Sequence, residues 1–240
     1  MDFSPPLIEG VLVKRYKRFL ADIILQDGRE ITAHCPNTGS MRGLTKLGSR
    51  VWLSQSASSG RKYPHTWEIV EEKEEGESEG VMVGVNTHNP NRIVGAALEK
   101  GEIPGLKMYT SIRREVPYGE KSRIDFLLEG EGRSPCYVEV KNVHYREGKT
   151  ALFPDSPTTR GQKHMDELAA LVTFKKARAI VFYLVQRSDC QFFDLGHAFD
   201  PLYAEKAKKA FDKEVEPLVY DCVLSPNGIH INKQLILKLT

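Results

Sequence analysis

Short runs of apolar residues separated by turn residues fill most of the first seventy positions of the chain. Two such runs, 19–25 and 30–34, flank Gln26-Asp27-Gly28-Arg29. Asp-Gly between strands predicts a hairpin, because a type I′ turn needs positive φ at both central residues. Further strands are predicted at 7–13, 50–54 and 66–71. About five short strands with Gly-rich connections favour a small closed barrel such as an OB-fold, and an open sheet is the alternative.

The pattern changes to helical spacing after residue 85. Residues 91–100 carry apolar side chains at helical spacing and are followed by Gly101, which predicts a helix. Strands and helices are then predicted in the order three strands, helix, strand, helix, two strands: 110–116, 123–128, 136–143, 160–176, 179–185, 201–213, 218–224 and 228–239. This order predicts a mixed sheet with helices on its faces. We therefore expect an α+β protein of two domains, a small β-barrel over residues 1–84 and a mixed-sheet αβββαβ domain over 85–240.

An acidic run separates the two patterns. Residues 71–80 (EEKEEGESEG) hold six Glu and one Lys, a balance of −5, and have no apolar periodicity. They form either an exposed hairpin tip or the approach to a domain boundary. Since the whole chain has a formal net charge of +2, the remainder carries +7. That remainder presents either a moderately basic surface to phosphates or an ordinary spread of charge.

The composition argues against membrane, secreted and zinc-ribbon proteins. The longest apolar run, 179–185, is far too short to cross a bilayer. The first residues lack the basic start and apolar stretch of a secretory signal, so we expect a cytoplasmic protein with no membrane partner. The four cysteines, at 35, 136, 190 and 222, form no Cys-x-x-Cys pair, which favours reduced structural thiols.

Two predicted neighbouring strands carry a pattern of acids that indicates chemistry. Asp125 interrupts the apolar strand 123–128, and Glu139 and Lys141 project from one face of the next strand because strand side chains alternate. If the two strands pair, one face gains two carboxylates and an ammonium, which are costly to desolvate without compensation. A divalent cation held by Asp125, Glu139, the carbonyl of Val140 and waters would compensate them. Such oxygen ligands suit Mg²⁺, or Mn²⁺ in its place.

Asp followed by Glu-x-Lys on the next strand resembles the PD-(D/E)xK nuclease superfamily. The resemblance implies a restriction-endonuclease-like fold for the second domain, with Asp125, Glu139 and Lys141 as catalytic residues. In that interpretation the metal polarises a scissile phosphate and lowers the pKa of an attacking water. Lys141 orients the water or stabilises charge on the phosphate.

Longer blocks resemble the bacterial and archaeal sugar fermentation stimulation protein A family over nearly the whole chain. The blocks are Phe19-Leu20-Ala21-Asp22, His34 to Met41 (HCPNTGSM), Val85-Asn86-Thr87, Ser122 to Leu128 (SRIDFLL), Tyr137 to Val143 (YVEVKNV), Phe153-Pro154-Asp155 and Arg160 to His164 (RGQKH). The resemblance implies an N-terminal OB-type domain, a C-terminal nuclease-like domain and DNA binding. It implies cleavage only through the superfamily.

The chain departs from the family pattern at two places. Ala96 stands where the helix before the three strands often carries Glu, so a metal site using that acid must substitute Glu99 or do without. Asp155-Ser156-Pro157-Thr158 replaces a more usual Asp-Ala-Val-Thr, which alters the loop but not the following helix.

Two clusters are candidate DNA contacts, on the barrel and on the helix that Thr158 or Thr159 could cap. The first holds cations and aromatics side by side, as single-strand binders do, although a solvated strand edge has the same composition: Lys14, Arg15, Tyr16, Lys17, Arg18 and Phe19. The second lies in the first turn of the helix, where the dipole favours anions: Arg160, Gln162, Lys163 and His164. Arg123 is expected to frame the site, with surface ion pairing as the alternative. The loop 37–40 offers backbone N–H groups to a phosphate or forms an ordinary polar turn.

Three functions remain open from the sequence. The first is a Mg²⁺-dependent deoxyribonuclease acting on single- or double-stranded DNA, largely without sequence preference. The second is a non-catalytic DNA-binding regulator of sugar-metabolism genes that keeps the nuclease fold. The third is an RNA-binding or RNA-processing factor. No convincing helix-turn-helix spacing is present, which disfavours operator recognition.

Overall fold

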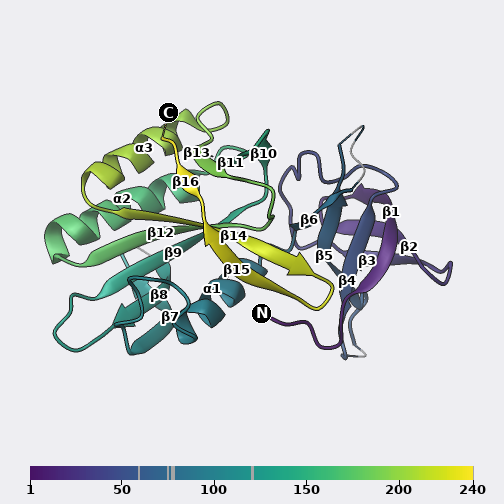
Figure 1. Cartoon of the computed structure of the whole chain (residues 1–240), viewed down its shortest axis with the longest axis horizontal. Helices are drawn as coiled ribbons and strands as arrows, with labels where there is room; N and C mark the ends of the chain where they lie inside the picture. Colours follow the sequence, from purple (N-terminus) through teal and green to yellow (C-terminus); the bar gives the residue numbers. More distant parts are fainter. Residues whose placement is uncertain (59, 75, 77–78, 120–121, 240) are drawn as a thin grey trace.

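The computed structural model describes residues 1–58, 60–74, 76, 79–119 and 122–239 and contains a barrel followed by a layered domain (Figure 1). The barrel strands are β1 (Ile8–Tyr16), β2 (Leu20–Leu25), β3 (Glu30–His34), β4 (Arg50–Gln55), β5 (His65–Glu72) and β6 (Val81–Gly84). They pair in the order β3-β2-β1-β4-β5-β6, and a further pairing of β3 with β5 closes the first five strands into a ring. The prediction of a closed OB-type barrel is therefore confirmed over an open sheet.

The predicted hairpin between β2 and β3 is confirmed, but its turn is of another type. The strands pair antiparallel, and Leu25 N donates to Arg29 O across a three-residue loop. Gly28 has a positive φ of 85°, while Asp27 is not among the residues with positive φ. A type I turn followed by a left-handed Gly needs positive φ at one residue only, which explains why Asp-Gly suffices.

The second domain begins with α1 (Asn89–Glu99) and contains two sheets. Its strands are β7 (Ser111–Tyr118), β8 (Ser122–Glu129), β9 (Cys136–Val143), β10 (Arg146–Glu147), β11 (Thr150–Phe153), β12 (Arg178–Val185), β13 (Phe192–Leu195), β14 (Glu216–Ser225), β15 (Gly228–Gln234) and β16 (Ile236–Leu237). Two more helices are α2 (Thr159–Lys175) and α3 (Pro201–Asp212). The large sheet has the order β15-β14-β12-β9-β8-β7, in which β9, β12 and β14 are parallel and the outer pairs antiparallel. The predicted mixed sheet is confirmed.

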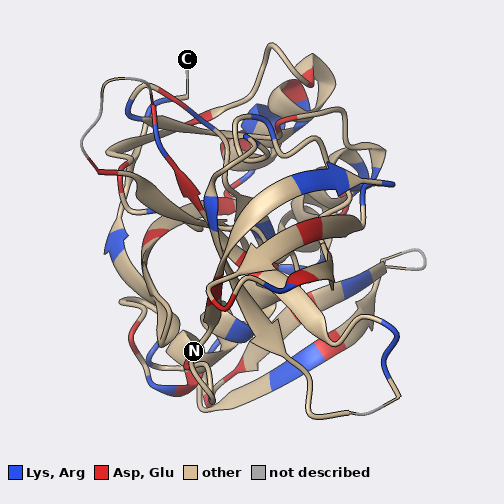
Figure 2. Ribbon diagram, turned by 90° about the vertical axis from the view of Figure 1, so that its right-hand side faces the viewer, with Lys and Arg blue, Asp and Glu red and all other residues tan. Residues whose placement is uncertain are grey.

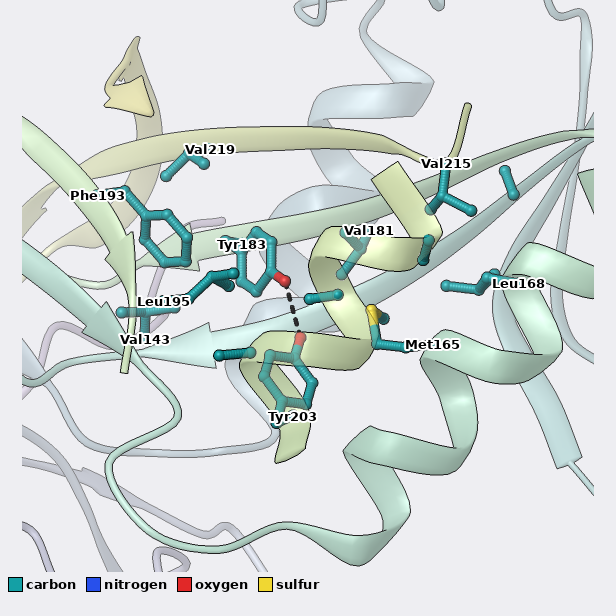
Figure 3. Close-up of a cluster of buried hydrophobic side chains, with 14 of the residues drawn as sticks. Val143, Met165, Leu168, Val181, Tyr183, Phe193, Leu195, Tyr203, Val215 and Val219 are labelled. Atoms are coloured by element: carbon teal, nitrogen blue, oxygen red, sulfur yellow. Dashed lines mark hydrogen bonds between the residues drawn. The ribbon is translucent and has the colours of Figure 1, made fainter. Parts of the chain in front are cut away.

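Helices cover the two faces of the large sheet. The face with α1 packs Ile93 and Val94 against strand residues such as Phe126 and Val138. The opposite face carries α2, α3 and the small sheet β10-β11-β13-β16. Figure 3 shows this second core, in which the hydroxyls of Tyr183 and Tyr203 share a hydrogen bond of 2.7 Å. That bond gives two fully buried polar atoms a partner and fixes α3 against β12.

The two domains share one apolar interface. Trp52 and Ile69 of the barrel belong to the same buried cluster as α1. The carboxylate of Glu68, buried in β5, accepts hydrogen bonds from Asn86 and Asn89 at 2.8 Å each. Glu68 therefore fixes the chain where it enters α1.

The acidic run joins β5 and β6, which pair antiparallel. Of the two alternatives expected for this run, the hairpin is therefore the one observed. Residues 75, 77 and 78 of the run lie outside the described residues. Figure 2 faces the barrel end of the molecule and shows basic and acidic segments interspersed over the coloured ribbon. Within the described residues, no helix is long and apolar enough to cross a membrane.

Candidate functional site

A pocket of about 360 Å³ lies where the barrel meets the second domain. Its wall includes Asp125, Glu139, Val140 and Lys141, the residues singled out from the sequence as a metal site. The barrel contributes Asn37 and Gly39 to the same wall. The pocket is therefore built by both domains.

Asp125 lies where β8 and β9 stop pairing. The register of the two strands runs from Leu128↔Cys136 to Phe126↔Val138 and ends one residue before Asp125. The freed backbone N–H of Val140 donates to Oδ2 of Asp125 at 2.7 Å, and Asn91 of α1 donates to Oδ1 at 2.6 Å. These two bonds fix the carboxylate at the pocket.

Glu139 is held from two sides. Lys141 Nζ, two residues along β9, donates to its Oε1 at 2.8 Å, as strand alternation predicts. Nδ1 of His164 on α2 contacts the same oxygen and lies 3.1 Å from Lys141 Nζ. Oε2 of Glu139 is buried and has no hydrogen-bond partner within the described part of the chain. One carboxylate oxygen is thus left to bind something else.

The two carboxylates have opposite pKa shifts. Burial, followed by the nearby charge of Glu139, raises the pKa of Asp125 to about 6. Burial also raises the pKa of Glu139, but Lys141 and His164 outweigh it and the pKa is lowered. The repulsion between the two acids is the kind that a cation bound between them would relieve.

The other residues predicted at the start of α2 lie in three different environments. Arg160 and Lys163 are exposed and line a neighbouring pocket together with Arg123, whose side chain also donates to Glu115 O. Gln162 instead donates both its bonds to Asp200, the N-cap of α3. His164 is only 3 % exposed, so it is placed inside the protein rather than at the surface expected of a phosphate contact.

His164 was missed as a partner of Glu139, although the sequence contains a signal for it. The buried stripe of α2 includes His164, Leu168 and Leu171, which follow one another at four and three residues. This is the spacing of a face that points into the core. Thr158 is confirmed as the N-cap, since its hydroxyl accepts from Gly161 N at 3.1 Å.

The basic run on the barrel lies at the hairpin tip between β1 and β2. Arg15 donates to the carbonyls of Arg18, Asn37 and Gly39, so its guanidinium holds the loop that enters the pocket. Lys14 forms an ion pair with Asp22 at 3.3 Å, and the Tyr16 hydroxyl donates to the same carboxylate. Lys17 and Arg18 are exposed in the turn, with φ of 48° and 63°. Phe19 is 44 % exposed rather than part of the core.

The departure at Ala96 has a structural counterpart. Glu99, the suggested substitute acid, is exposed and pairs with Arg114 at 2.8 Å, and it does not line the pocket. The residue of α1 that reaches the site is Asn91. Asp155 also lines the pocket, beside His144, which the sequence did not single out.

The donor set fits a hard divalent cation. Within the described residues, no group of three or more His, Cys, Asp or Glu side chains is arranged to hold a metal. A metal in this pocket would therefore depend on the two carboxylates, backbone oxygen and water. Mg²⁺ binds in this way, through one or two carboxylates with waters or substrate phosphate completing the shell. Among the described residues no donor bonds the buried Oε2 of Glu139, so this oxygen is available as a metal ligand.

Comparisons with known proteins cover both domains. The family model for the N-terminal OB domain of SfsA matches residues 13–85, and the model for the sugar fermentation stimulation protein RE domain matches residues 88–228. The sugar fermentation stimulation protein homolog of Pelobacter propionicus is 52% identical over 232 residues, which cover 96% of this chain and 97% of that one. The homolog of Rhodospirillum centenum is 51% identical over 236 residues, 98% of each chain. The solved structure of Pyrococcus furiosus SfsA in complex with Ca²⁺ matches with a TM-score of 0.85 at 26% identity and covers 99% of this chain and 98% of that chain.

Proposed function

The chain belongs to the sugar fermentation stimulation protein family, and on that premise we propose that it binds DNA, largely without sequence preference, and hydrolyses phosphodiesters at a Mg²⁺ site. The observation that carries the proposal is the pair Asp125 and Glu139, which line one pocket with a buried carboxylate oxygen left unpartnered. The related P. furiosus protein was solved with Ca²⁺, a hard cation with the same preference for oxygen ligands.

Asp125, Glu139 and the carbonyl of Val140 would hold the metal. The N–H of Val140 donates to Asp125, and the N–H and C=O of one strand residue point to the same side. The Val140 carbonyl therefore faces Asp125 as well. A bound divalent ion supplies Lewis-acid activation of the phosphate and a lowered pKa for the attacking water.

The remaining groups position and stabilise. His164 and Lys141 bind Oε1 of Glu139 and thereby leave Oε2 as the oxygen that would bind the metal. The Lys141 ammonium also places a positive charge where the negative charge on the phosphate increases during attack. Arg123, Arg160 and Lys163 line the adjacent pocket and would bind the neighbouring backbone phosphates.

The test is incubation of the protein with single-stranded, duplex and branched DNA in Mg²⁺ or Mn²⁺. We expect cleavage that EDTA abolishes and that falls at least about a hundredfold in Asp125→Asn and Glu139→Gln. Glu131→Gln, on the exposed connection between β8 and β9, is the matched control and should retain wild-type cleavage. Metal-independent cleavage, or full activity in Glu139→Gln, would overturn the proposed site.

A second candidate is a DNA-binding regulator that does not cleave. It is favoured by α1, which brings the amide of Asn91 rather than a carboxylate to Asp125. A regulator of this kind binds DNA with a steep salt dependence, binds equally well in Asp125→Asn, and leaves all substrates intact. Competition between DNA and RNA of one sequence separates both candidates from an RNA-binding function.

A further inference from the structure

Part of the pocket wall is built from polar groups that the metal site does not use. Asn37, from the barrel, is 3 % exposed, and His144, just after β9, is 7 % exposed. Both line the pocket. Within the described residues, Nδ2 of Asn37 and both ring nitrogens of His144 are buried without a hydrogen-bond partner. Unpaired buried donors cost free energy, which a ligand that accepts their hydrogen bonds recovers.

Asn37 is held in a fixed position. Its Oδ1 accepts from Gly39 N at 2.8 Å, and its backbone carbonyl accepts from Arg15 at 2.8 Å. Thr87 donates to the carbonyl of Pro36 next to it, at 3.1 Å. Since these bonds use the amide oxygen and the backbone carbonyl of Asn37, its Nδ2 is left as a donor for a ligand.

Asp155 brings a negative charge to the same part of the wall. His144 Nε2 lies 3.5 Å from its Oδ2, and Ser40 of the barrel donates to that oxygen at 3.1 Å. The neighbouring His144 imidazole, and after it the hydrogen bond from Ser40, lower the pKa of Asp155 in spite of its burial, so the carboxylate is ionised at neutral pH. An ionised carboxylate repels a phosphate, so the group bound here is neutral and offers both a donor and an acceptor.

We propose that this part of the pocket binds the base edge of one unpaired nucleotide, with Asn37 as donor and Asp155 as acceptor. The inference rests on the proposed function, because it places the nucleotide beside the phosphate that would bind to the metal held by Asp125 and Glu139. The Watson–Crick edge of a base carries donors and acceptors together, and in a duplex these are already paired. The pocket, with a volume in the range of small-ligand sites, therefore selects single-stranded or extruded nucleotides over intact duplex.

The experiment measures the dissociation constant of the full chain for a short fluorescein-labelled oligonucleotide, single-stranded and annealed, by fluorescence anisotropy in EDTA so that nothing is cut. We expect the single strand to bind at least about tenfold more tightly than the duplex, because unpairing a base costs free energy. A scan that places one abasic site at each position should reveal one or two positions that weaken binding by about threefold to tenfold.

Asn37→Asp tests the residue itself. The substitution keeps the acceptor for Gly39 N and replaces the Nδ2 donor by an acceptor, so the affinity for the single strand should fall. In this variant, oligonucleotides with an abasic site should bind as tightly as the intact oligonucleotide, because the contact to the base is already lost. Asn227→Asp, which adds the same charge at an exposed turn, is the control and should bind as wild type.

The outcomes separate this inference from the function it rests on. Failure of the wild type to bind either DNA overturns the proposed function and this inference with it. Binding with equal constants for single strand and duplex, or a flat abasic scan in the wild type, overturns the nucleotide pocket alone. The wild-type scan decides the matter even if Asn37→Asp does not fold.

Discussion

Nδ1 of His164 on α2 contacts Oε1 of Glu139 on β9, twenty-five residues earlier in the chain. Both side chains are buried, and Lys141 completes the cluster from the same strand as Glu139. The contact fixes which oxygen of Glu139 is occupied and which is left for a ligand. It connects the start of α2 to the centre of the large sheet, so a change in the helix alters the geometry of the proposed metal site.

His164→Ala should lower the affinity for Mn²⁺ by about tenfold to a hundredfold, because groups that orient a metal ligand have effects of this size. Isothermal titration calorimetry measures the affinity directly. His197→Ala, which removes an exposed imidazole, should bind Mn²⁺ as the wild type does. Unchanged affinity in His164→Ala would mean that the imidazole does not position Glu139.

Asp125→Asn should stabilise the metal-free protein at about pH 8 by about 1–3 kcal/mol. The pKa of Asp125 is raised from 3.8 to about 6, first by burial and then by Glu139. An acid with a higher pKa in the folded chain adds stability that is complete below the unfolded value and is lost as the pH rises through the folded value. Asparagine at position 125 still accepts the hydrogen bond from Val140 N. If the Asn91 amide rotates, its oxygen accepts a hydrogen bond from the NH2 group of the new asparagine, so both hydrogen bonds of the carboxylate are replaced.

Urea unfolding in EDTA measures this difference. The gap between Asp125→Asn and wild type should narrow as the pH is lowered from about 8 to about 4.5. When Mg²⁺ replaces EDTA, the free energy of unfolding should rise more for the wild type than for Asp125→Asn, since a ligand that binds only the folded chain stabilises it. A gap that is constant with pH would show that the carboxylate is not under electrostatic strain in the fold.

Arg160→Ala should weaken DNA binding to all sequences alike and reduce the slope of log K against log salt by about one. The side chain is exposed and lines both the metal pocket and the basic pocket beside it. Anisotropy titrations over a range of salt concentrations give the slope. Arg133→Ala, at the exposed connection between β8 and β9, should leave the slope as it is. Equal slopes for the two variants would remove Arg160 from the binding surface.

Arg187→Met should destabilise the protein by about 1–3 kcal/mol, because it removes one of the two arginines, Arg146 and Arg187, that pair with the partly buried carboxylates of Glu72 and Asp189. Arg187 is fully buried and lies two residues beyond the end of β12. Its guanidinium binds Glu72 of the barrel and Asp189 of the second domain. The free energy from urea unfolding is compared with that of Arg133→Met, an exposed position where a change within about 0.5 kcal/mol is expected. A loss as small as the control's would mean that this ion cluster does not join the domains.

Strand alternation carried the sequence prediction furthest. Alternating apolar and charged positions placed Glu139 and Lys141 on one face, and the 2.8 Å bond between them bears this out. The barrel strands β1 to β5 and the helices α1, α2 and α3 were also predicted to within a few residues, whereas the short strand β6 was not predicted. These features depend on local periodicity, which a single sequence displays.

Features that depend on distant pairing were missed. The small sheet joins β11 to β13, four residues each and about forty residues apart, which is too short for alternation to be visible. The proximity of Asn37 and Asp155 was also missed, because the fold brings them to one pocket from different domains. Gln162 was placed among DNA contacts by its position in the helix, but its amide is used to cap α3 through Asp200.

The barrel is attached to the second domain at both of its ends. The first residues of the chain pair with β15, where Phe3 N donates to Asn227 O and Ile229 N donates to Met1 O. At the far end of the barrel sequence, Gly84 N donates to Gln186 O beyond β12. Two separate attachments remove the swivel that a single linker allows, so we expect the pocket between the domains to keep its width when a ligand binds.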